Sequence, residues 1–140
     1  MIVSLIAKRK VRSSWAMWNR YDLDAFLANW ADDAVFSYPT DVSVGGVIVG
    51  KKAIREFYQR FVEQFPKKKF VLRNICIGDT SLLKGKAVVT VEATAELTNK
   101  DGKDFKMDYC IAMESRGFKA IRVAEYVNDM AALKRAWGEA

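Results

Sequence analysis

The chain has 140 residues, of which 51% are hydrophobic and 29% charged, and this composition predicts one globular domain over residues 1–140. It contains no histidine. Histidine is the side chain most used for acid–base catalysis near neutral pH and the commonest ligand of catalytic zinc. Any chemistry must therefore use carboxylates, phenols, amines or thiols, and we expect neither a metal nor an organic cofactor.

The formal net charge is +6, and basic residues concentrate at positions 8–12 and 67–69. Neither run alternates with aromatic residues, and no helix-turn-helix or zinc-knuckle pattern is present, so we do not expect nucleic-acid binding. The apolar run at the start of the sequence is far below the ~20 residues that cross a bilayer. Basic residues follow this run, whereas they precede the apolar segment of a secretory signal. We expect a cytoplasmic protein without a membrane partner.

Two cysteines, Cys76 and Cys110, lie in alternating apolar runs without the spacing of a zinc site. We expect both to be buried thiols. A disulfide between them requires their two strands to pair, and nothing else in the sequence indicates an oxidising compartment.

The first third of the chain predicts two helices and a short strand. Apolar residues predict a helix over 4–21, and Asp22 has the place of an N-cap for a short second helix that ends at residues 31–33. Residues 34–39 then have the pattern of a strand that ends at proline. Residues 40–49 form a loop that can include a small strand at 47–49.

The segment from Gly50 to Pro66 predicts an amphipathic helix of about four turns. Its large apolar residues recur at three- and four-residue steps, and the other face is charged. Gly50 suits the turn before the helix, and Pro66 cannot continue the hydrogen bonding. Aromatic side chains of this size need a broad apolar surface opposite them, which the remaining strands can supply.

After this helix the hydrophobic period becomes two, which predicts strands over 69–77, 86–98, 104–115 and 118–127. A closing helix follows, capped by Asn128 or Asp129. The separation of helices from strands predicts an α+β fold, with a curved sheet wrapped round three N-terminal helices. Large residues on the helices and small ones at Ala93 and Ala95 indicate a sheet that bends and leaves a cavity.

Two local runs carry a resemblance to a known superfamily. The sequence WADDAVFSYP at 30–39 and the sequence VGKKAIREFY at 49–58, in this order of elements, resemble the cone-shaped nuclear transport factor 2-like proteins. Within that superfamily the chain is most similar to the SnoaL-like polyketide cyclases and to ketosteroid isomerases. The resemblance covers about residues 12–137. It implies a cone with a pocket for an apolar ligand and chemistry without a cofactor.

Ketosteroid isomerase is similar enough over these runs to compare single positions. Its general-base aspartate corresponds to Tyr38, the tyrosine of its oxyanion hole to about Ser14, and its protonated aspartate to about Ile111. Two aromatic positions are retained as Trp30 and Tyr58. The base and both oxyanion donors are therefore missing, so the resemblance does not imply steroid isomerisation by that mechanism.

Limonene-epoxide hydrolase, a second relative, has an aspartate before a tyrosine in its last strand, and the similar pair here is Glu125 and Tyr126. Its arginine is missing near residues 90–92, so a complete water-activating triad is not expected. Glu125 lies among aliphatic residues, where burial would raise its pKa toward the range of a general base. The sequence leaves open which face of this strand lines the pocket.

We therefore expect a small hydrophobic molecule to bind in an aromatic pocket. Glu125 would act as the base of an isomerase, cyclase or hydrolase, and Tyr38 would act as a hydrogen-bond donor. Ligand contacts are expected from Trp18, Trp30, Tyr58, Tyr109, Ile111, Tyr126 and Asn128. The alternative is a binding module without catalysis. In either case we expect a homodimer formed through the outer face of the sheet, where Thr90, Glu92, Thr94 and Asp108 would meet a second copy.

Overall fold

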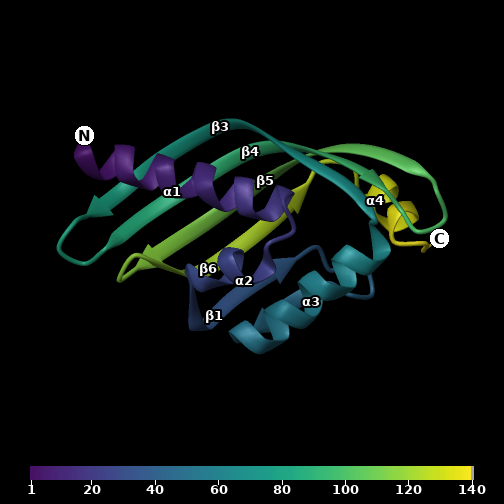
Figure 1. Cartoon of the computed structure of the whole chain (residues 1–140), viewed down its shortest axis with the longest axis horizontal. Helices are drawn as coiled ribbons and strands as arrows, with labels where there is room; N and C mark the ends of the chain where they lie inside the picture. The colour runs from purple at the N-terminus through teal and green to yellow at the C-terminus, as the bar shows by residue number, and fades with distance from the viewer. Residues whose placement is uncertain (140) are drawn as a thin grey trace.

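The computed structural model describes residues 1–139 as a curved six-stranded sheet with helices on its concave side (Figure 1). The strands lie in the order β2-β1-β6-β5-β4-β3. The helices are α1 (Ile2–Asn19), α2 (Leu23–Ala28), α3 (Lys51–Gln64) and α4 (Met130–Ala136). The strands are β1 (Trp30–Tyr38), β2 (Gly46–Val49), β3 (Lys67–Ser81), β4 (Lys86–Thr98), β5 (Asp104–Arg116) and β6 (Lys119–Val127). The predicted α+β cone is confirmed.

Pairing of β1 with β6 makes the sheet mixed. All other neighbours are antiparallel, but β1 runs parallel to β6, with Phe36 opposite Val123 and Ser37 opposite Ala124. This pairing joins the N-terminal third of the chain to its last strand. It places the aromatic residues of β1 beside the strand that carries Glu125.

The two central strands follow the predicted alternation. In β4, alternate residues from Val89 to Leu97 are buried, and their neighbours in β5 include Ile111 opposite Val91 and Tyr109 opposite Ala93. Since successive side chains of a strand point to opposite faces, one face of this pair is fully apolar. That face forms the concave wall opposite the helices.

Strand β3 contains an irregularity that the sequence pattern did not predict. The register with β4 shifts between Leu72 and Asn74, so the side chains on the inner face change from Phe70 and Leu72 to Ile75 and Ile77. An extra residue in one strand of a pair produces this change of face. The prediction that Cys76 is buried was wrong for this reason: Cys76 is exposed, and Cys110 is half-buried. Both thiols are free, because β4 separates their strands.

The helix boundaries have the capping residues that the sequence indicated. The Asp22 carboxylate accepts the Ala25 N–H at 3.1 Å, and Asp129 caps α4 by accepting the Ala132 N–H at 2.9 Å. Gly50 precedes α3 with φ of +90°, a conformation that favours glycine. Strand β1 begins at Trp30, earlier than predicted, because residues 31–33 form an irregular stretch of the strand where its register with β6 shifts.

The core lies between the concave face and α1–α3. Trp18 from α1 packs on Tyr58 and Phe61 of α3, with ring centroids 5.0 and 5.7 Å apart, and on Phe70 of β3 at 5.5 Å. Tilted and edge-on contacts of this kind stabilise buried rings beyond their loss of exposed area. None of the helices in the described part of the chain has the length and apolar character needed to span a membrane.

Candidate active site

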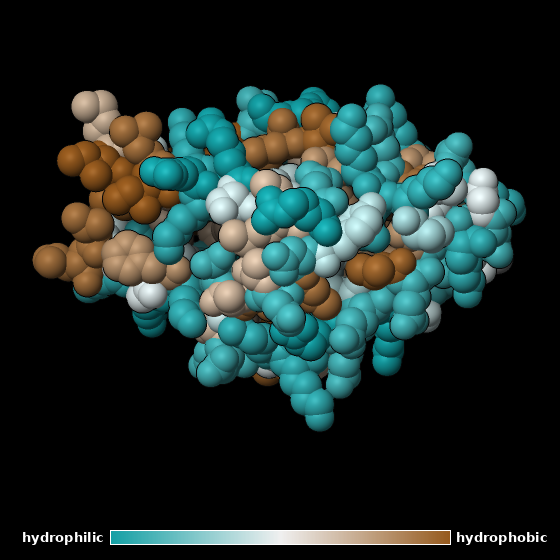
Figure 2. All heavy atoms as spheres, in the orientation of Figure 1, coloured by the Kyte–Doolittle hydropathy of each residue, from teal (hydrophilic) through white to brown (hydrophobic). Residues whose placement is uncertain are grey.

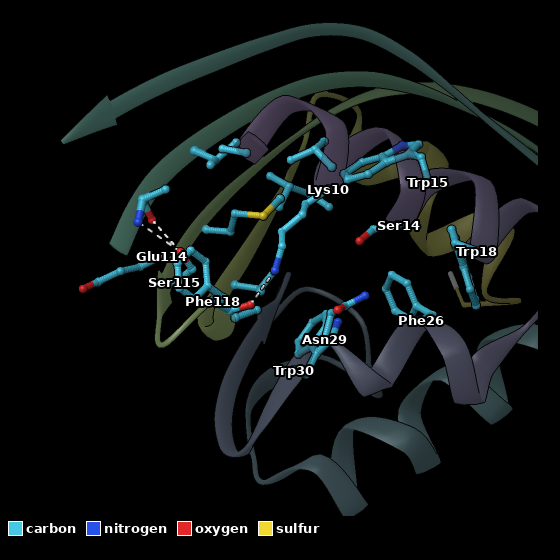
Figure 3. Close-up of a pocket in the computed structure, with 18 of the residues that line it drawn as sticks. Lys10, Ser14, Trp15, Trp18, Phe26, Asn29, Trp30, Glu114, Ser115 and Phe118 are labelled. Atoms are coloured by element: carbon cyan, nitrogen blue, oxygen red, sulfur yellow. Dashed lines mark hydrogen bonds between the residues drawn. The ribbon is translucent and has the colours of Figure 1, made fainter. Parts of the chain in front are cut away.

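A cavity of about 150 Å³ lies between α1 and the concave face of the sheet. Its walls come from α1, α2, α3 and strands β1 and β3–β6, and 10 of its 29 lining residues are aromatic. Figure 3 shows Ser14 and Trp18 projecting from α1 toward Phe26, Asn29 and Trp30. The aromatic lining consists of Trp15, Trp18, Phe26, Trp30, Phe57, Tyr58, Phe61, Phe70, Tyr109 and Phe118.

Two acidic side chains line this cavity, Glu114 on β5, which is paired with Arg122 at 3.4 Å, and Glu125 on β6. Glu125 pairs with Ile111 of β5, whose side chain lines the same wall. Within residues 1–139 the Glu125 carboxyl has neither an ion-pair partner nor a hydrogen bond. Glu125 is half-buried in the cavity wall, and this burial among apolar side chains raises its pKa to about 8, because they solvate the charged form poorly.

This pKa gives Glu125 two chemical forms near neutral pH. The protonated carboxyl donates a hydrogen bond, and the ionised form accepts a proton from a bound molecule. A general base works best when its pKa lies near the operating pH. An unpaired carboxyl with such a pKa in an apolar cavity is typical of a catalytic site.

Two phenols of the cavity wall, Tyr58 and Tyr109, lie close enough to Glu125 for its charge to raise their pKa. The pKa of Tyr58 is raised well above its ordinary value, first by burial and next by Glu125. The pKa of Tyr109 is raised by the same two causes in the same order. Both phenols therefore keep their protons and can donate hydrogen bonds to an oxygen atom in the cavity.

Trp15 supplies a third polar group. Its side chain is buried on α1, and its indole N–H lies near enough to the Tyr109 hydroxyl to lower the pKa of that phenol, but it makes no hydrogen bond of full geometry within the described residues. A buried donor without a partner costs free energy, and such a group in a cavity wall suggests a ligand acceptor or bound water. The other polar groups of the wall are Ser14 and Asn29 (Figure 3).

Tyr38 lies beside the cavity but does not line it. Its ring packs on Phe57 with centroids 4.7 Å apart, and its hydroxyl accepts a hydrogen bond from the Trp137 indole N–H at 3.1 Å. Burial, and next the charge of Glu125, raise the pKa of Tyr38. The side chain is therefore part of the core and is not among the residues that line the cavity.

The remaining predicted residues fall into two groups, those that line the cavity and those that do not. Trp18, Trp30, Tyr58, Tyr109 and Ile111 line the cavity. Tyr126 and Asn128 do not, and Tyr126 is 62% exposed on the outer face. Neighbouring residues of a strand point to opposite faces, so an inward Glu125 requires an outward Tyr126. The structure thus answers which face of the last strand lines the pocket.

Sequence reasoning missed Trp15, Asn29, Met113 and Lys10 as lining residues. For Trp15 a signal was available, because Val11, Trp15 and Trp18 recur at helical spacing and all three are buried. Lys10 had no signal. It lies at the outer end of the cavity, where its ammonium donates to the Phe118 carbonyl oxygen at 3.2 Å (Figure 3).

Comparison with known proteins agrees with this architecture. The profile of the SnoaL-like domain matches residues 11–123. No protein with a curated description matches the chain.

Three solved structures are similar over nearly the whole chain. An NTF2-like protein of unknown function from Burkholderia pseudomallei is 17% identical, covers 92% of this chain and 95% of its own, and has a TM-score of 0.79. TerC, crystallised with polyporic acid, is 20% identical with a TM-score of 0.75 and the same two coverages. A proposed polyketide cyclase from Xanthomonas campestris is 19% identical, covers 95% of both chains and has a TM-score of 0.66. At these identities the likeness shows the fold alone.

Proposed function

Because the chain belongs to the SnoaL-like family, we propose that it is a cofactor-independent enzyme that moves a proton on a small, largely apolar carbonyl compound. The observation that carries this proposal is Glu125, an unpaired carboxyl in an aromatic cavity with a pKa of about 8. Packing of the fold does not require a carboxyl at this position. Burying it without a partner destabilises the folded chain, and catalysis is a reason to keep it.

The proposed step is abstraction of a proton from the carbon next to the carbonyl. The ionised Glu125 takes the proton, and the electrons of the C–H bond move to the carbonyl oxygen to form an enolate. The phenol of Tyr58 or Tyr109 donates a hydrogen bond to that oxygen, where negative charge develops. Return of the proton to another carbon completes an isomerisation. Alternatively, the enolate carbon attacks a second carbonyl carbon of the same molecule; the π bond of that carbonyl breaks, its oxygen takes the proton from Glu125, and a ring is formed.

The size and lining of the cavity favour an aromatic or polycyclic substrate that is only partly enclosed. Its volume of about 150 Å³ is below the ~300–1,000 Å³ usual for ligand sites, so it holds a ring-sized part of a molecule. The rest would lie at the outer end beside Lys10 and Phe118. One similar structure was crystallised with polyporic acid and another is a proposed polyketide cyclase, which supports this class of ligand.

This proposal differs from the mechanism of ketosteroid isomerase in the origin of the base. The position of that base is Tyr38 on β1, which does not line the cavity, whereas Glu125 is on the neighbouring strand β6. The two oxyanion positions, Ser14 and Ile111, do line the cavity but lack an acidic or phenolic donor. In our proposal Tyr58 and Tyr109 take the donor role that the sequence had assigned to Tyr38.

Exchange of hydrogen for deuterium tests the proposal directly. Cyclic and aryl ketones are incubated in D2O with the wild-type protein, with Glu125→Gln and with Glu63→Gln, an exposed residue of α3. We expect the wild type and Glu63→Gln to exchange the protons next to the carbonyl, as followed by NMR. The rate should rise with pH through about 8, because only the ionised carboxyl is a base.

Glu125→Gln should lower the exchange rate by at least 10²-fold, the usual contribution of a general base. Ligand binding is measured in a separate experiment, by quenching of the fluorescence of the tryptophans in the cavity wall. Binding by both proteins without exchange by either would instead support the binding module, in which Glu125 has no catalytic role. Equal exchange by the wild type and Glu125→Gln would assign the base to another residue.

Two further parts of the expected biology remain proposals. Free thiols at Cys76 and Cys110 are consistent with a reducing compartment, which supports a cytoplasmic location. The outer face of the sheet exposes Val71, Val88 and Tyr126, which supports a homodimer through this face.

A further inference from the structure

One end of the molecule exposes large apolar side chains from three separate segments. The first segment is residues 1–10, at the start of α1. The second is residues 79–86, which contain the turn from β3 to β4, and the third is residues 115–119, which contain the turn from β5 to β6. We name these three segments together the tip. The exposed large apolar residues of the tip are Met1, Ile2, Leu5, Ile6, Leu82, Leu83 and Phe118. Figure 2 shows them gathered at the end that holds the start of α1 and the β3–β4 turn in Figure 1.

The two turns of the tip are joined by backbone hydrogen bonds. The Gly117 N–H donates to the Lys84 carbonyl at 2.9 Å, and the Phe118 N–H donates to the Gly85 carbonyl at 3.1 Å. Gly85 has a φ of +56°, and a Cβ on it would lie 2.5 Å from the Phe118 nitrogen, so only glycine permits this approach. Lys10 joins α1 to the same turn through the Phe118 carbonyl. The exposed apolar groups therefore sit on a preformed surface.

The tip also carries the whole net charge of the chain. It contains seven Lys and Arg residues and one acidic residue, Asp79, which is a balance of +6. The other 117 residues contain 16 basic and 16 acidic residues and are formally neutral. Asp79 is itself paired with Lys86 at 2.7 Å, and the neighbouring Glu114 is paired with Arg122 at 3.4 Å.

We propose that the tip docks on the surface of an anionic lipid bilayer, with its apolar side chains among the lipid head groups and acyl chains. Apolar residues flanked by lysine and arginine are the combination that binds such surfaces, because burial of apolar area and attraction to acidic lipids act together. A second copy docked tip to tip would bring two charges of +6 together, which disfavours that occupant. Acidic lipids neutralise the same charge.

Docking in this orientation has a consequence for the cavity. Val3, Ile6 and Phe118 of the tip also line the outer end of the cavity, so the bound protein would present that end to the lipid. An apolar ligand would then pass between bilayer and cavity without crossing water. The docking itself is independent of the proposed catalysis, since no residue of the tip takes part in the proton transfer.

The sequence-based expectation of no membrane partner considered only segments that span a bilayer. A surface contact needs no spanning segment, and it depends on residues that lie far apart in the sequence. The apolar residues of α1 and of the two turns meet only after β3–β6 have paired. The pattern is therefore visible in the fold and not along the chain.

Vesicle sedimentation tests this proposal with a matched pair of variants. Leu83→Glu places a charge at a fully exposed position of the tip, and Val47→Glu places the same charge on β2 at a position that is 70% exposed. Neither side chain is in the core, so both variants should fold, which circular dichroism checks. Vesicles contain phosphatidylcholine alone or a mixture with phosphatidylserine.

We expect the wild type and Val47→Glu to bind the mixed vesicles at low salt at least tenfold more tightly than the neutral ones. Leu83→Glu should weaken that binding about tenfold, and added salt should release the bound protein. Absence of binding to the mixed vesicles would overturn the proposal, as would equal binding by the two variants. Sedimentation equilibrium that shows a dimer lost only in Leu83→Glu would also overturn it, since the tip would then contact a second copy.

Discussion

Glu125 shows how a single residue in this fold departs from the behaviour of its type. Most glutamates are solvated or paired, whereas this carboxyl faces aromatic and aliphatic side chains. Its position follows from strand pairing: Ile111 opposite it on β5 faces the cavity, so Glu125 must face the cavity as well. The sequence identified the residue through its aliphatic neighbours. It could not give the face, because alternation along β6 alone is compatible with either one.

The raised pKa of Glu125 predicts how the stability of the fold depends on pH. A glutamate in the unfolded chain has a pKa near 4.5, and the folded value is about 8. Between these values the folded state holds a proton that the unfolded state has released. The free energy of unfolding is therefore highest below about pH 4.5, falls as the pH rises from 4.5 to 8, and levels off once Glu125 is ionised in both states. Each pKa unit corresponds to about 1.4 kcal/mol.

Denaturant unfolding at a series of pH values measures this effect. The free energy of unfolding of the wild type should fall between pH 5 and 8, relative to Glu125→Gln, whose side chain does not titrate. Lys68 has a pKa lowered to about 8 by burial, so its own effect raises stability between pH 8 and 10.5, outside this window. Parallel curves for the two proteins from pH 5 to 8 would show that Glu125 is solvated in the folded state.

Among the elements, α4 is the shortest helix outside α2, yet it closes the core beside β1. Trp137, which follows α4, donates to the Tyr38 hydroxyl and packs on Phe65 with ring centroids 5.2 Å apart. Two buried amides, of Gln64 and Asn99, donate to the carbonyl of Ala136 at 2.8 and 3.3 Å. Since a helix of seven residues is marginal by itself, these contacts and its N-cap hold it in place.

Removal of the cap should therefore weaken this end of the fold. Asp129→Ala loses the carboxylate that accepts the Ala132 N–H, and loss of an N-cap costs about 1 kcal/mol. Asn128→Ala is the control, because this exposed neighbour does not cap the helix and should change stability by less than about 0.5 kcal/mol. Thermal unfolding measures both. Equal stability of the two variants would mean that packing of Trp137 holds α4 without the cap.

Features that depend on adjacent residues could be predicted from the sequence. Features that depend on which strands pair, and in which register, could not. The caps at Asp22 and Asp129 and the alternation in β4 depend on adjacent residues, so the sequence showed them. The shift of register in β3 depends on how that strand meets β4, and it exposed Cys76 against expectation. The parallel contact of β1 with β6 joins residues that are 87 to 90 positions apart, a separation on which local pattern carries no information.

On the scale of the whole molecule, the convex face of the sheet is the surface available to a second copy. It carries the exposed side chains Val71, Val88 and Tyr126, and its central charge, Asp108, is already paired with Arg73 at 3.0 Å and accepts from Thr94 at 2.7 Å. A face whose charges are paired within the chain can be covered at lower cost than one with unpaired charges. This favours the homodimer that the sequence suggested.

Sedimentation velocity tests that assembly. We expect the wild type to sediment as a dimer and Tyr126→Glu to sediment as a monomer, because each copy would bury an unpaired carboxylate in the interface. Gln59→Glu places a charge at an exposed position of α3, on the concave side of the sheet, and should remain dimeric. A monomeric wild type, or a dimer that tolerates Tyr126→Glu, would place the contact elsewhere.

The curvature of the sheet forms the cavity, and the register of β5 and β6 orients Glu125 into it. The surrounding apolar side chains then raise the pKa of Glu125. The most direct test is an NMR titration of the glutamate side-chain carboxyl carbons, with the Glu125 signal assigned by its loss in Glu125→Gln. The account predicts a midpoint at about pH 8. A midpoint near 4.5 would contradict it, because a solvated carboxylate has no special capacity to act as the base of this site.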